Sequence, residues 1–187
     1  MAATDPLPEP DRLEGAPHPR ETATLFGQAQ AESAFLQAFT SGRLHHAWML
    51  TGPKGVGKAT LAWRLARFLL ATPDDAGGLF AAPPPTSLDV DPTNPIARRL
   101  LQLAEPRHFL LRRAPNDKET ALSQVISVDE VRKMKSFFAL TAADGGRREE
   151  GDDEAGGQAD TAARHPADPG GGLVLLDDLD LAVVPTL

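Results

Sequence analysis

The chain has 187 residues and a formal net charge of −7, which argues against a domain that binds nucleic acid through a strongly basic surface. It contains no cysteine, so disulfides and cysteine-ligated zinc sites are excluded. No apolar run approaches the ~20 residues that cross a membrane, and the first residues lack the basic start and apolar run of a signal peptide. These features predict a cytoplasmic protein without a membrane partner.

Composition divides the chain into four regions. Residues 1–20 are rich in proline and charged residues without apolar periodicity, which predicts a disordered leader. Residues 21–146 carry the regular apolar patterns of one folded domain, and residues 147–171 form an acidic low-complexity insertion. Residues 172–187 begin with an apolar run, which we interpret as a strand of the same domain, followed by a chain end that comes too early for a complete fold.

Apolar spacing predicts the secondary structure of the folded regions. Helical spacing of apolar residues predicts helices at 28–40, 58–71, 95–104 and 128–140. Short apolar runs, typical of strands buried in parallel sheets, stand at 47–51, 109–113 and 173–178. The alternation of strands and helices predicts an α/β fold, with a parallel sheet flanked by helices on both faces.

The strongest functional signal is a glycine-rich loop between the first expected strand and the second expected helix. It consists of Gly52, Pro53, Lys54, Gly55, Val56, Gly57 and Lys58. Its glycines and its lysine match the phosphate-binding motif G-x-x-x-x-G-K-[S/T], in which backbone N–H groups and the N-terminus of the next helix surround the phosphates of a nucleotide such as ATP. The alternative is a glycine-rich turn with a solvated Lys58.

One position departs from this motif. Ala59 stands where a Ser or Thr hydroxyl normally binds Mg²⁺. Thr60 comes one residue later, and a step of one residue turns a side chain by ~100° around the helix, so Thr60 does not replace the missing ligand. Because in-line hydrolysis depends on the magnesium ion, we expect weak or no ATP hydrolysis, whereas phosphate binding is compatible with Ala59.

The apolar run at 173–176 ends in two acidic residues. An acid at the end of such a strand orients Mg²⁺ through water in P-loop ATPases, which makes Asp177 the candidate magnesium-side acid. Asp178 then stands where a catalytic glutamate often lies, with a side chain one methylene shorter. The alternative is an ordinary buried strand that ends in a polar loop.

Two dense blocks of the sequence resemble the delta-prime subunit of bacterial DNA polymerase III, of alphaproteobacterial type. The blocks are residues 25–28 (LFGQ) with 45–62 (HHAWMLTGPKGVGKATLA), and 125–133 (VISVDEVRK) with 137–146 (FFALTAADGG). The resemblance implies a P-loop AAA+-type α/β fold that is incomplete at its C-terminal end. It also places Phe26 and Gln28 near an adenine pocket, and a core aromatic is the alternative for Phe26.

The resemblance implies a role in assembly. Subunits of this type stand in a ring with the clamp-loader ATPase subunits and delta, and the complex places the sliding clamp on primed DNA during replication. They are usually regarded as non-hydrolysing, in agreement with Ala59. The acidic insertion and the early chain end depart from the family pattern.

Other interpretations of the sequence stay open. One alternative is a catalytic P-loop AAA+ ATPase such as a helicase loader, and another is a truncated product without function. Arg98-Arg99 and Arg112-Arg113 are the local basic groups that would contact DNA, with solvated helix and strand ends as the alternative.

Overall fold

A computed structural model of the chain describes residues 9, 12–13, 15–45, 47–72, 83–116, 121–123, 125–144, 173–177 and 182–185. The helices in this part are α1 (Ala29–Thr40), α2 (Lys58–Ala71), α3 (Pro95–Leu101) and α4 (Val128–Asp144). The strands are β1 (Ala47–Leu50), β2 (His108–Arg112), β3 (Leu173–Asp177) and β4 (Ala182–Pro185).

The predicted helices and strands are confirmed to within four residues at each end. Strand β4 is an addition that no sequence pattern predicted. The expected insertion at 147–171 and the predicted role of Asp178 fall outside the described residues. Within the described part, no helix is long and apolar enough to cross a bilayer.

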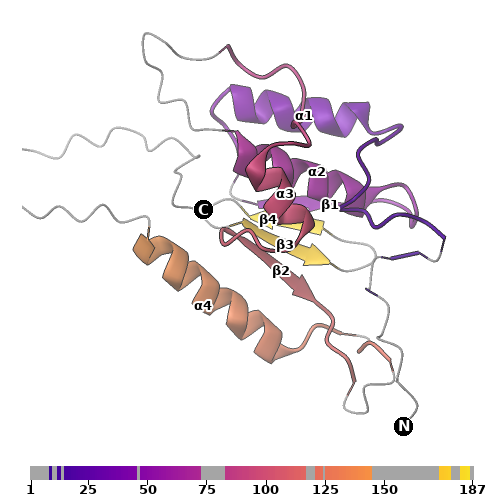
Figure 1. Ribbon diagram of the computed structural model, residues 1–187, viewed down its shortest axis with the longest axis vertical. Coiled ribbons are helices and arrows are strands. Elements are labelled where there is room, and N and C mark those ends of the chain that lie inside the picture. Colours follow the sequence, from indigo (N-terminus) through magenta and orange to yellow (C-terminus); the bar gives the residue numbers. More distant parts are fainter. Residues whose placement is uncertain are drawn as a thin grey trace, which may run out of the picture.

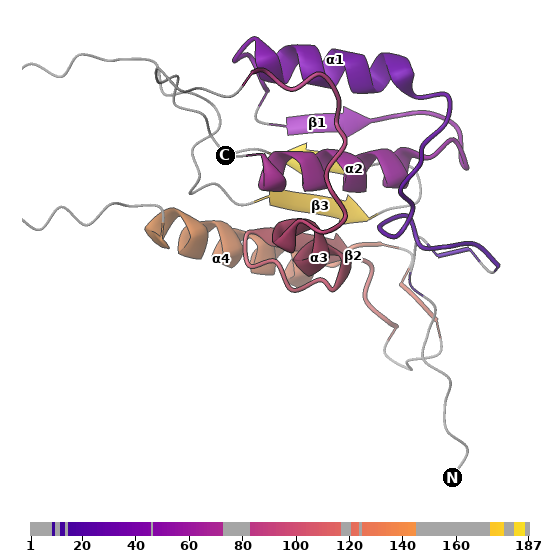
Figure 2. The same cartoon turned by 45° about the horizontal axis from the view of Figure 1, so that its top comes forward.

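The strands form two hydrogen-bonded pairs. Strands β2 and β3 are parallel, and their last residues, Arg112 and Asp177, are partners in the register. Strands β1 and β4 are antiparallel, and β4 also contacts β3. Helices α1, α2 and α3 lie on one side of the strands and α4 on the other (Figure 1). Figure 2 shows β1 and β3 pointing in the same direction, so their carboxyl ends lie at the same end of the molecule.

Helix α2 is the centre of the core because it is buried on two sides. Toward α1, Phe68 packs edge-on against Phe35 and Phe39, with ring centroids 6.4 and 4.9 Å away. Toward α3, the fully buried Trp63 shares a second apolar cluster with Leu100.

The ends of the short helix α3 are set by specific residues. The side chain of Asn94 accepts hydrogen bonds from the backbone N–H groups of Ile96 (2.8 Å) and Ala97 (3.4 Å), and so caps the helix start. Beyond the helix, Leu103 has φ 55°, and its N–H donates to the Leu100 carbonyl while the next N–H donates to the Arg99 carbonyl. This is the Schellman arrangement, with leucine at the position where glycine is usual.

The segment that precedes α1 runs along α2. Arg67 donates to the carbonyl oxygens of Arg20 and Thr22 at 3.3 Å each, and Arg64 donates to the Ala23 carbonyl at 3.1 Å. His18 is fully buried, and its ring lies edge-on to Trp63. The structure thus differs from the expected disordered leader over residues 15–20, because arginines on α2 supply donors to this irregular backbone.

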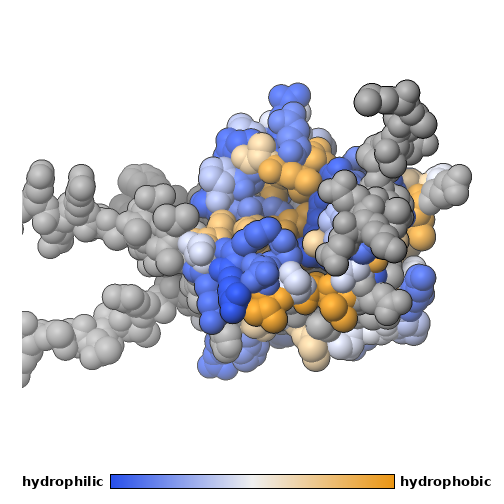
Figure 3. Space-filling model, turned by 90° about the horizontal axis from the view of Figure 1, so that it is seen from below, coloured by the Kyte–Doolittle hydropathy of each residue, from blue (hydrophilic) through white to orange (hydrophobic). Residues whose placement is uncertain are grey.

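Several large apolar side chains remain exposed. On β1, Trp48 and Leu50 face the core, whereas Met49 is 65% exposed on the opposite face. Val128, the first residue of α4, and Val125, three residues before it, are each 67% exposed. Figure 3 shows apolar side chains gathered in patches between hydrophilic ones on the face seen from below.

Candidate functional site

The glycine-rich loop joins the end of β1 to the start of α2. Gly52, Gly55 and Gly57 have φ angles of 149°, 86° and 90°, which side chains with a Cβ rarely adopt. Gly57 is the N-cap of α2, and no side chain caps the helix there. The N–H groups of the first helical turn therefore lie next to an exposed, strongly curved loop, which is the arrangement that suits an anion.

Lys58 folds back onto this loop. Its Nζ donates to the carbonyl oxygens of Gly52 at 2.7 Å and of Pro53 at 2.9 Å. The lysine is therefore anchored to the loop, which argues against the alternative of a freely solvated side chain. Chemically, the ammonium group sits where it can exchange two carbonyl partners for the oxygens of an incoming phosphate.

Ala59 and Thr60 are the second and third residues of α2, and both are half-buried. The methyl group of Ala59 supplies no oxygen at the position where the motif has a magnesium ligand. Nowhere in the described ranges do three or more histidine or acidic side chains lie close enough together to hold a metal ion. The other loop residues that the motif includes, Pro53, Lys54 and Val56, are exposed.

Residues 25–28, the first segment of the resemblance to delta-prime, lie directly against the loop. Gln28 donates from Nε2 to the Val56 carbonyl oxygen at 2.8 Å. A Cβ on Gly57 would lie only 2.6 Å from Leu25 Cδ1. Phe26 is 84% exposed, so the core alternative for this aromatic is wrong. The structure therefore brings together two segments that are separate in the sequence.

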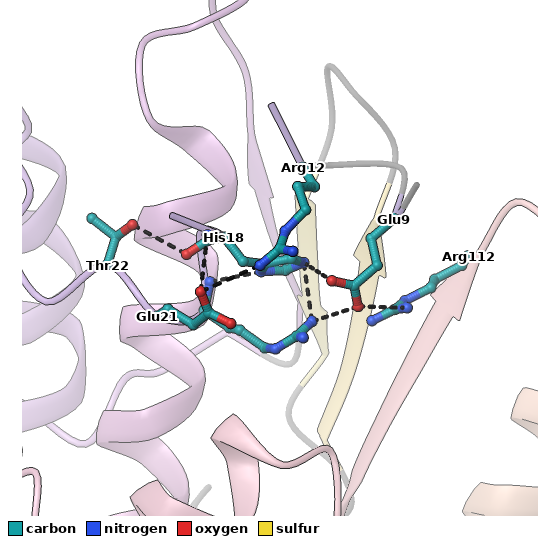
Figure 4. Close-up of polar contacts among 7 residues, drawn as sticks. Glu9, Arg12, His18, Glu21, Thr22 and Arg112 are labelled. Atoms are coloured by element: carbon teal, nitrogen blue, oxygen red, sulfur yellow. Dashed lines mark hydrogen bonds and ion pairs between the residues drawn. The ribbon is translucent and has the colours of Figure 1, made fainter. Parts of the chain in front are cut away.

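Asp177 ends β3 beside the last residue of β2, Arg112. Arg112 Nη1 lies 3.3 Å from Glu9 Oε1, and Arg20 Nη1 lies 2.7 Å from the same oxygen (Figure 4). His18 Nε2 lies 3.4 Å from the other carboxylate oxygen. Burial raises the pKa of Glu9, but the Arg20 hydrogen bond and the nearby positive charges outweigh it, so that the pKa is below its ordinary value.

Sequence reasoning missed this Glu9 cluster. Glu9 and Arg112 are more than a hundred positions apart, and no motif or periodicity links a proline-rich leader to the end of a strand. His18 gave no signal either: histidine is intermediate between the buried and the exposed residue types, and nothing in the local sequence indicates that this one is buried.

Three of the four arginines in the basic pairs singled out from the sequence make polar contacts within the chain. The carboxylate of Glu105 is almost fully buried, and it accepts hydrogen bonds from Arg99 Nε at 2.8 Å and Arg107 Nε at 3.0 Å. Arg112 pairs with Glu9 as described. Arg113 Nη1 donates to the Ser123 carbonyl oxygen at 3.5 Å, and Arg98 and Arg99 are both exposed on α3. Arg99 and Arg112, two of the four arginines considered for DNA contact, are thus paired with acidic side chains of the same chain.

Comparison with known proteins finds a partial similarity. No family model matches the chain, and no solved structure matches it significantly. The DNA polymerase III subunit gamma of Buchnera aphidicola subsp. Schizaphis graminum is 39% identical over 51 residues, as is that of Buchnera aphidicola subsp. Acyrthosiphon pisum. The match covers 27% of this chain and 14% of each relative. It supports a relation to the clamp-loader family, without distinguishing the delta-prime type.

Proposed function

We propose that the chain is a clamp-loader subunit of the delta-prime type, which helps a DNA polymerase III complex to load its sliding clamp on primed DNA. The observation that carries the proposal is the loop at 52–58, with its positive φ angles, its uncapped helix and its anchored lysine. The partial similarity to DNA polymerase III subunit gamma supports the clamp-loader role. The two blocks that resemble delta-prime favour that subunit.

The loop binds the phosphates of ATP or ADP in this proposal. Backbone N–H groups around Gly57 and the first turn of α2 hold the phosphate oxygens, and Lys58 turns from its two carbonyl partners to them. The exposed ring of Phe26, next to the loop, offers an apolar surface to the base. Asp177, at the carboxyl end of β3, is the candidate acid for a magnesium ion held through water.

The proposed activity is binding with little or no hydrolysis. Ala59 leaves the metal without its usual hydroxyl ligand, and in-line attack depends on a well-placed metal. The partners are the clamp-loader ATPase subunits and delta, and the contact with the clamp and with primed DNA runs through the complex. Exposed apolar side chains such as Met49 and Val128 suit a protein that works in an assembly.

The fold that goes with this function is a P-loop AAA+-type α/β sheet. The parallel pairing of β2 with β3, and the strand–loop–helix order at the phosphate loop, support this proposal. The antiparallel pairing of β1 with β4 is a departure from an all-parallel sheet. We also propose a cytoplasmic location, where replication complexes of bacteria work.

Calorimetric titration with ATP and ADP in the presence of Mg²⁺ tests the proposed site. We expect Lys58→Ala to weaken binding by about 10–100-fold, as the loss of charge-assisted hydrogen bonds to phosphate would. Lys135→Ala, which removes the same charge from an exposed position on α4, is the matched control and should bind as the unchanged protein does. Equal binding by both variants would contradict a phosphate site at this loop.

Turnover of ATP separates the proposal from its rival. We expect phosphate release close to the background rate. Rapid release that requires Mg²⁺ and disappears in Lys58→Ala would instead favour a catalytic AAA+ ATPase, such as a helicase loader.

A further inference from the structure

The hydrogen bond between Gln28 and the phosphate loop comes from a residue whose backbone is held at the start of α1. Gln28 immediately precedes α1, and its carbonyl oxygen accepts the N–H of Glu32 at 3.0 Å, so its backbone belongs to the helix start. From there its Nε2 donates to the Val56 carbonyl oxygen at 2.8 Å. A side chain rooted in α1 therefore holds one particular peptide group of the loop.

That peptide group joins Val56 to Gly57. In a trans peptide the carbonyl oxygen and the following N–H point in opposite directions, because the whole unit is planar. With the Val56 oxygen held toward α1 by Gln28, the N–H of Gly57 points to the opposite side of the loop. This N–H directly precedes the N–H groups of the first turn of α2, which no side chain of the N-cap residue caps.

The same peptide group would otherwise turn easily. Its orientation depends on the ψ angle of Val56 and the φ angle of Gly57, and Gly57 has no Cβ to restrict that rotation. Leu25, from the same segment as Gln28, lies against Gly57, since a Cβ there would be 2.6 Å from Leu25 Cδ1. Residues 25–28 thus restrain the loop at two adjacent residues.

We infer that Gln28 is a positioning residue, which presents the Gly57 amide to the phosphate of a bound nucleotide. The inference rests on the proposed nucleotide site and gives Gln28 a role in phosphate binding instead of base recognition. It follows that Gln28 contributes to every ligand that carries the phosphates, whatever its base. Inorganic pyrophosphate is therefore as informative a probe as ADP.

The test compares the Gln28→Glu variant with the unchanged protein and with the Gln30→Glu variant. At about pH 7.5 the glutamate is ionised, so Gln28→Glu keeps the shape of the side chain but replaces the donor with a group that repels the Val56 oxygen. Gln30→Glu makes the same change in charge at an exposed position of α1. Affinities for ADP and for pyrophosphate are measured by calorimetry, and the Gly57 amide is followed by ¹⁵N–¹H NMR.

We expect Gln28→Glu to weaken ADP and pyrophosphate alike, by about fivefold to tenfold, as expected for one hydrogen bond. The Gly57 amide signal should shift in Gln28→Glu and stay in place in Gln30→Glu. Loss of ADP affinity with unchanged pyrophosphate affinity would overturn the inference, since Gln28 would then contact the base. Unchanged affinity for both ligands would also overturn it.

The same measurements distinguish a failure of the proposed function from a failure of the inference about Gln28. If the unchanged protein binds neither ADP nor pyrophosphate, the nucleotide site is wrong and the ligand part of the inference falls with it. The NMR comparison then decides alone whether Gln28 orients the Gly57 amide, and an unmoved Gly57 signal in Gln28→Glu rejects that as well.

Discussion

Replacement of Gly57 by alanine tests whether the backbone conformation of the phosphate loop and its contact with Leu25 both require glycine at this position. The φ angle of 90° at Gly57 costs an L residue about 1–2 kcal/mol. The new Cβ would lie 2.6 Å from Leu25 Cδ1, so the leucine must leave its preferred rotamer, at a further cost of about 0.5–1.5 kcal/mol. We expect Gly57→Ala to lower the free energy of unfolding by about 1.5–3.5 kcal/mol in total.

Gly55→Ala is the matched control for this variant. Gly55 lies in the same loop with φ 86°, and a Cβ there meets nothing within 4 Å, so only the backbone cost applies. Urea unfolding followed by the fluorescence of Trp48 and Trp63 measures both variants. In a double-mutant cycle, Leu25→Ala should relieve the additional cost of Gly57→Ala. The reasoning is refuted if Gly57→Ala and Gly55→Ala destabilise the protein equally.

Three further predictions concern stability. Leu103→Gly should raise the free energy of unfolding by about 0.5–1 kcal/mol in urea titrations, because glycine removes the left-handed strain at φ 55°, whereas Leu103→Ala should bring no gain. Asn94→Ala should lower it by about 1 kcal/mol, since two N–H groups of α3 lose their cap; an unchanged midpoint would contradict this. Burial lowers the pKa of His108, whose ring packs on Trp63, to about 4 from 6.5. The fold thus favours the neutral imidazole, and the contribution of His108 to the free energy of unfolding is complete above pH 6.5. This contribution is lost as the pH falls toward 4, by about 1.4 kcal/mol per pH unit. His108→Phe should abolish that part of the slope in unfolding titrations between these pH values, and an unaltered slope would show that other groups cause it.

The elements of the fold could be predicted from local patterns. Helix α2 begins at Lys58 because the glycine loop ends there, and α4 begins after Ser127, whose Oγ accepts the N–H of Glu130. These signals lie within a few residues of the feature that they specify. The strand β4 and its antiparallel pairing could not be predicted, since they depend on the partner that β1 finds far along the chain.

The candidate site was predicted in part. The glycines and Lys58 were found because their chemistry requires a fixed spacing. The contact of Gln28 with Val56 could not be found, because it joins residues 28 positions apart through a single hydrogen bond. For Phe26 the sequence left an adenine pocket and the core as alternatives, because an isolated aromatic is more often buried. Only the tertiary structure shows that Phe26 is exposed while its neighbours Leu25 and Gln28 turn toward the loop.

The central claim, a clamp-loader subunit of the delta-prime type, is tested most directly by its partners. The full chain, carrying an affinity tag, is expressed in a bacterium whose DNA polymerase III subunits are known, and the proteins retained with it are identified by mass spectrometry. We predict recovery of the clamp-loader ATPase subunits together with delta. The same subunits should be recovered with the Lys58→Ala variant if assembly does not need nucleotide. Retention of a replicative helicase without these subunits, or of chaperones alone, would contradict the account.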